Sequence, residues 1–146
     1  MFQVWPRYLT AFLLGFGLDL FKRSYEPFVN SPLSILIIPF AAFVSSLILA
    51  VCVVLGLPII RSQRARTIWF RSPVPATVIL LVGGFFFLNG IHEAHHAYFV
   101  EQASPDSANA ILRAKTLPGF VGIVFSVLYW PFPSASRLSS TASPPP

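Results

Sequence analysis

The stretch LSILIIPFAAFVSSLILAVCVVLGL, residues 33–57, contains no charged residue and decides the fold class. An apolar run of this length can cross the hydrocarbon core of a bilayer as a helix. Ser31 and Pro32 supply a helix start, and Pro58 followed by Arg61 marks the end. The sequence therefore predicts a transmembrane helix here.

Small side chains recur every four residues within this helix, at Ala42, Ser46 and Ala50. This spacing places them on one face, where a neighbouring helix can approach closely. We expect this stripe to be a packing seam.

The composition extends the same conclusion to the whole chain of 146 residues, because 55% are hydrophobic and only 10% are charged. An ordinary soluble domain has about 25% charged residues. We therefore expect a polytopic membrane protein in contact with the lipid bilayer, with a single helical domain over residues 1–133. The length leaves no room for a separate nucleotide-binding domain. The net charge is +5, but the basic residues are scattered at the ends of apolar runs, which indicates a topology signal and not a nucleic-acid surface.

Three further segments complete the predicted membrane domain. Residues 5–21 form a short first span, favoured over a cleaved signal peptide because no small-x-small site follows and Asp19 interrupts the end. The third helix begins near residues 72–75 and continues from the apolar block into a polar stretch at 89–96. The fourth run, 117–130, is too short to span unless a helix from about Ile111 continues past Pro118. The tail, residues 134–146, is mostly Ser, Ala and Pro, and we expect it to be disordered.

The basic residues predict the orientation of this all-α domain of four transmembrane helices. Four arginines fill the loop after the second helix: Arg61, Arg64, Arg66 and Arg71. Such a loop lies on the cytoplasmic side, or on the matrix side in an organelle, and by alternation both termini lie there too. The host would be a plasma membrane, a bacterial inner membrane or an organelle inner membrane. The first and fourth segments could instead lie in the interface.

The segment His92-Glu93-Ala94-His95-His96 fits the pattern His-Glu-x-x-His. On a helix, His92 and His96 share a face and can bind one zinc ion, with Glu93 as general base toward the bound water. These five residues resemble the signature of zinc metallopeptidases, which implies a membrane-embedded zinc hydrolase. Such a site needs a third ligand, for which Glu101 and Asp106 are the nearest oxygen donors.

The same segment also resembles one histidine box of membrane di-iron desaturases and hydroxylases. Three histidines in the whole chain cannot supply a site that needs several such boxes.

Two other interpretations of the histidine segment involve no catalysis. The imidazoles mark the point where the third helix leaves the hydrocarbon and enters water. Alternatively, Asn89, His92, Glu93 and His96 form a polar stripe toward a neighbouring helix, where they could bind a metal, relay a proton or sense pH.

Asp19 is the other polar residue at apparent membrane depth. Intramembrane carboxylates are functional candidates. Lys22 and Arg23 lie three and four residues further on, however, so an ion pair within the helix would also account for Asp19.

These observations leave three functions open. The leading prediction is a non-catalytic accessory or assembly subunit that binds a protein partner, or a second copy of itself, through helix packing. The second is a zinc-dependent hydrolase that uses His92, Glu93 and His96. The third is a proton-linked transport component that uses Asp19 and the histidine stripe.

Overall fold

The computed structural model describes residues 5–23 and 36–131, and nearly all of these residues are helical. The helices are α1 (Trp5–Arg23), α2 (Ile37–Arg61), α3 (Gln63–Arg71), α4 (Val74–Phe99) and α5 (Pro105–Leu128). The predicted all-α class is confirmed. The predicted helix start at Ser31 and the tail 134–146 lie outside the described residues.

Three helices, α2, α4 and α5, are long and apolar enough to cross a membrane, which marks the chain as an integral membrane protein. The fourth predicted segment is part of a longer helix, because α5 runs unbroken through Pro118. The first predicted segment forms α1, of 19 residues, which is not among these three helices. Four spans and the sidedness of the termini therefore stay predictions.

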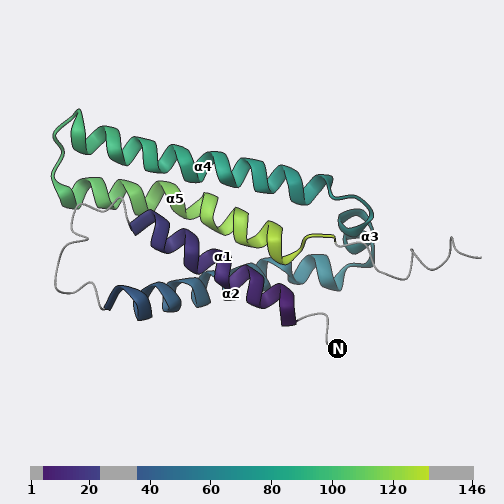
Figure 1. The fold of residues 1–146 in the computed structure, drawn as a ribbon. Coiled ribbons are helices and arrows are strands. Elements are labelled where there is room, and N and C mark those ends of the chain that lie inside the picture. Colours follow the sequence, from purple (N-terminus) through teal and green to yellow (C-terminus); the bar gives the residue numbers. More distant parts are fainter. Residues whose placement is uncertain (1–4, 24–35, 132–146) are drawn as a thin grey trace, which may run out of the picture.

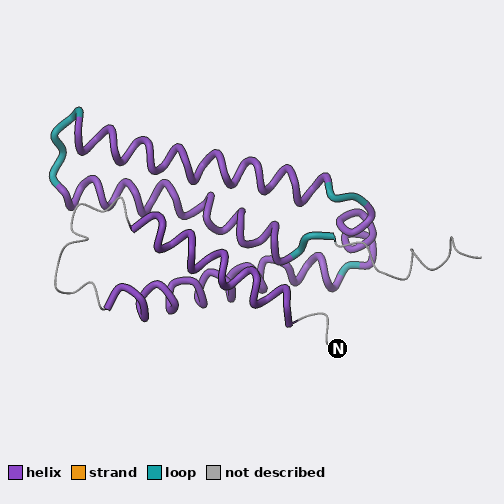
Figure 2. Tube along the Cα trace, viewed as in Figure 1, coloured by secondary structure: helices purple, strands orange, loops and turns teal. Residues whose placement is uncertain are grey.

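The four long helices lie side by side, and successive ones run in opposite directions (Figure 1). Short loops join the helices from α2 to α5 (Figure 2). The central helix is α5, because it packs against α4, α1 and α2. Its buried side chains include Leu112, Phe120 and Val124, which belong to the apolar core of the bundle.

The tightest packing joins α4 to α5. Small residues are buried at every seventh position of α4: Ala76, Gly83, Gly90 and Ala97. A Cβ atom on Gly83 would lie 3.0 Å from the carbonyl oxygen of Gly119, and one on Gly90 would lie 2.8 Å from the backbone nitrogen of Thr116. The two backbones therefore touch, as small-residue packing in membranes allows.

The buried stripe of α2 lies one residue earlier than the predicted seam. It consists of Ala41, Ser45, Ile48 and Cys52, which are at most 5% exposed. The residues of the predicted seam are half-buried at Ala42 and exposed at Ser46 and Ala50. Alternating steps of four and three residues keep a stripe facing one neighbour, whereas repeated steps of four drift around the helix.

The predicted arginine loop is a helix, which corrects the expectation for residues 61–71. The nine residues of α3 include neither glycine nor proline, and the Ser62 side chain accepts a hydrogen bond from the backbone N–H of Ala65 at 3.3 Å. Arginine and alanine are good helix formers and Ser is a preferred N-cap, so the segment needs no loop. In Figure 1, α3 is viewed nearly along its axis at one end of the bundle, so it lies crosswise to the long helices.

The described acidic residues gather at one end of the bundle, whereas basic residues lie at both ends, with Lys22, Arg23, Arg113 and Lys115 at the acidic end. The end with α3 carries Arg61, Arg64, Arg66 and Arg71, and the start of α1, which contains Arg7, lies at the same end (Figure 1). The described acidic residues are all at the opposite end, in the second half of α1 and around the α4–α5 turn: Asp19, Glu93, Glu101 and Asp106.

Candidate functional site

An open groove of about 500 Å³ lies between the end of α4 and the start of α5. The chain brings the two segments together because it turns through residues 100–104, where the backbone N–H of Ala103 donates to the carbonyl oxygen of Ala97 at 2.9 Å. The groove is lined by His92, Glu93, His96, Ala97, Glu101, Ile111 and Lys115. Four of the residues singled out from the sequence, His92, Glu93, His96 and Glu101, therefore share one site.

Both carboxylate oxygens of Glu93 have a polar partner. The amide nitrogen of Asn89, one turn earlier, donates to Oε1 at 2.7 Å. The ammonium of Lys115, which reaches across from α5, lies 3.2 Å from Oε2. These two contacts fix the position of the carboxylate, and each of its oxygens keeps a further lone pair. The ion pair between Glu93 and Lys115 connects α4 to α5.

His92 and His96 lie along the same face of α4, as their spacing predicts. Their rings are stacked with centroids 6.4 Å apart. Nδ1 of His96 is 3.4 Å from Oε1 of Glu101, and both side chains are exposed to about one half or more. Of the predicted metal ligands, His92, His96 and Glu101 are the ones that lie close together.

A complete set of metal ligands is not assembled in residues 5–23 and 36–131: no three His, Cys, Asp or Glu side chains there form a group that could hold a metal ion. Asp106, the other suggested third ligand, lies in the first turn of α5 and outside the groove. A carboxylate in that position is favourable for the helix N-terminus. The zinc site stays a prediction.

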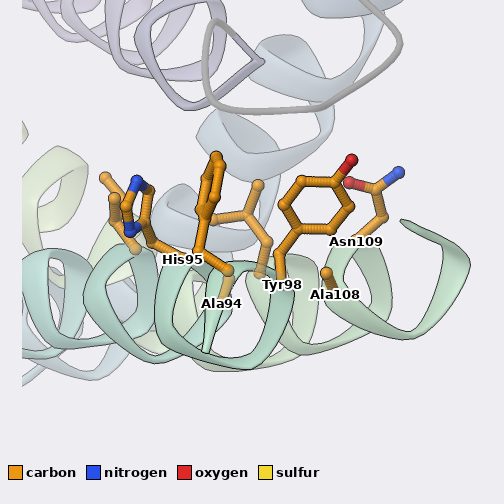
Figure 3. Close-up of a pocket in the computed structure, with 8 residues that line it drawn as sticks. Ala94, His95, Tyr98, Ala108 and Asn109 are labelled. Atoms are coloured by element: carbon orange, nitrogen blue, oxygen red, sulfur yellow. The ribbon is translucent and has the colours of Figure 1, made fainter. Parts of the chain in front are cut away.

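The third histidine belongs to the other flank of the α4–α5 pair. The ring of His95 packs 4.4 Å from that of Phe99. Figure 3 shows His95, Tyr98 and Asn109 pointing to the same side of this pair, around a cavity of about 20 Å³. This volume has room for about one water molecule, so the cavity is too small for a substrate.

Asp19 is fully buried and forms the ion pairs that its spacing predicts. Oδ1 lies 3.0 Å from Nζ of Lys22, and Nε of Arg23 donates to Oδ2 at 2.7 Å. The guanidinium of Arg23 also lies 4.9 Å from the ring centre of Phe40 on α2. The charge of Asp19 is therefore balanced within α1, beside a helix packed against it.

Sequence reasoning did not find the partner of Glu93 or the helical state of α3. Both had signals. If two antiparallel helices meet at a turn centred on Gln102 and Ala103, Gly90 lies opposite Lys115, and Lys115 is then within reach of Glu93. For α3 the signal is Ser62, an N-cap residue that precedes a run without glycine or proline.

No protein-family model, curated protein or solved structure matches this chain.

Proposed function

We propose that this chain is a non-catalytic membrane protein that acts as an accessory or assembly subunit. It binds a protein partner, or a second copy of itself, through the outward face of α2. The observation that carries the proposal is the small-residue stripe of Ala42, Ser46 and Ala50, two of whose members are exposed. The Ser46 hydroxyl donates to the carbonyl oxygen of Ala42 at 2.8 Å, so it needs no partner outside the helix. Such a face allows the close approach of another helix.

The state of Glu93 supports a non-catalytic role. Its two oxygens are engaged by Asn89 and Lys115, which gives the side chain a role in joining α4 to α5 that requires no hydrolytic water. The ion pairs of Asp19 likewise give it a structural role, which makes proton transport the weaker alternative.

We further propose four spans, with the α3 end on the cytoplasmic or matrix side. The cluster of Arg61, Arg64, Arg66 and Arg71 around α3 supports this orientation, because arginine-rich connections are retained on that side. Packing of α1 against α2 and α5 supports a fourth span. At about 1.5 Å per residue, the 19 residues of α1 extend roughly 28 Å, close to the thickness of the hydrocarbon core.

The test is a photo-crosslinking amino acid placed at Ser46 of α2 or, as the control, at Leu81, which is 67% exposed on α4. In native membranes we expect a discrete protein adduct from Ser46 and only lipid adducts from Leu81. Mass spectrometry of the adduct separates a second copy from a different protein. Lipid adducts alone at both positions would refute a contact surface on α2.

A companion measurement addresses catalysis. Glu93→Gln is expected to leave the Ser46 adduct unchanged. A metal-dependent hydrolase activity that is lost in Glu93→Gln, with the metal retained, would instead favour the zinc hydrolase.

A further inference from the structure

The helix α3 differs from every other helix of the bundle in its direction. It lies crosswise to α2, α4 and α5, at the arginine-rich end (Figure 1). If the long helices cross a bilayer, a helix perpendicular to them lies parallel to the membrane surface. A short helix with apolar and cationic side chains in this position is typical of the headgroup layer.

One aromatic residue attaches α3 to the bundle. The ring of Trp69 packs edge-on against Phe125 of α5 with centroids 5.6 Å apart, and its Nε1 donates to the backbone oxygen of Tyr129 at 2.9 Å. The side chains on the other faces of α3 are exposed, including Ile68 at 69% and Phe70 at 37%. The contact at Trp69 therefore sets which face of α3 is turned outward.

Two arginines lie on the face opposite Trp69. Arg64 and Arg71 are seven residues apart, which is close to two helical turns, so their side chains point in nearly the same direction. Beside Arg64 the surface forms an open hollow of about 340 Å³ that is also lined by Gln63, Thr67 and Ile68. This hollow combines a cationic edge with an apolar wall, as does the boundary between headgroups and acyl chains.

These arginines have no ion-pair partner among the described residues. The acidic groups with a cation close by are all at the other end of the bundle, where Asp19, Glu93 and Glu101 lie near Lys22, Lys115 and His96. The guanidinium groups of α3 are therefore available to an anion from outside the chain. A guanidinium matches a phosphate with two parallel hydrogen bonds.

We propose that α3 is an interfacial helix whose Arg64–Arg71 face binds the phosphate of anionic phospholipid headgroups. The apolar side chains of Ile68 and Phe70 enter the upper acyl region, and the arginine stems extend toward the headgroups. Each arginine near an anionic membrane surface strengthens binding by about fivefold. Loss of both should weaken the preference for anionic lipid by about 25-fold.

The experiment is native mass spectrometry of the full chain in detergent, with phosphatidylglycerol or phosphatidylcholine added. Detergent removes membrane sidedness, so a pure topology determinant predicts no preference between the two lipids. We expect the wild type to prefer phosphatidylglycerol, and R64Q/R71Q to lose that preference while keeping its helical circular dichroism. The matched control R61Q/R66Q removes the same charge from the same region and should keep most of the preference. R64K/R71K keeps the charge without the planar group and should be intermediate.

Equal binding of both lipids to the wild type would overturn the proposal, as would a preference that survives R64Q/R71Q. An equal loss in R61Q/R66Q would assign the preference to the total charge of this end and not to the Arg64–Arg71 face. Complete displacement of the lipid by excess inorganic phosphate would identify free phosphate as the ligand.

Discussion

Substitution of Gly119 by alanine is expected to force α4 away from α5. A Cβ atom at Gly119 would overlap the backbone nitrogen of Phe87 and the backbone oxygen of Gly83. Both atoms belong to the backbone, so no side-chain rotation can relieve the overlap. The two helices must separate along a contact that contains much of the buried surface of α4.

The expected cost is a balance of two effects. Alanine is favoured over glycine within a helix by about 0.5–1 kcal/mol. Overpacking of a closely packed interface costs about 1–3 kcal/mol, and an overlap with the backbone belongs at the upper end. Gly119→Ala should therefore lower the free energy of unfolding by about 2 kcal/mol.

The matched control is Gly84→Ala on α4, where no atom lies within 4 Å of the added Cβ. This variant should be neutral or more stable by up to about 1 kcal/mol. The measurement is reversible unfolding in mixed detergent micelles, followed by helical circular dichroism. If Gly119→Ala proves as stable as Gly84→Ala, the close contact of α4 and α5 at this level is refuted.

Three further changes test the remaining contacts. Asp19→Asn should lower the free energy of unfolding by about 3 kcal/mol, because it leaves Lys22 and Arg23 without their buried counter-charge. A loss below about 1 kcal/mol in the same assay would contradict the ion pairs. Trp69→Phe keeps an aromatic ring but removes the hydrogen bond to Tyr129, which should cost about 1 kcal/mol and speed hydrogen exchange in α3, while unchanged exchange would argue against this attachment. Protein purified without chelator should hold no stoichiometric zinc by mass spectrometry; about one zinc per chain that is lost in His92→Ala/His96→Ala would favour the zinc hydrolase.

The contacts within one helix were predictable from the sequence. The ion pairs of Asp19 with Lys22 and Arg23, and the alignment of His92 with His96, depend only on spacings of three and four residues. Helical geometry makes such residues neighbours wherever the helix lies. The sequence could therefore assign Asp19 a structural partner without knowledge of the fold.

Contacts between helices depend on rotation and register, which local spacing does not determine. The predicted seam on α2 used only its small residues, whereas the buried stripe includes Ile48 and is shifted by one residue. A shift of one residue rotates a helix face by about 100°. The choice between neighbouring faces came from packing against α1 and α5.

The same distinction applies to the functional site. The sequence by itself determined that the chain is a helical membrane protein. Residues 33–57 carry no charge and only 10% of the whole chain is charged, so its apolar surface is best solvated by lipid. Only the tertiary structure decided that Glu93 is bound to Lys115 and that α3 lies across the end of the bundle. Hydropathy is a property of each segment, whereas these contacts arise from the register of antiparallel helices and from one tryptophan that binds a distant backbone oxygen.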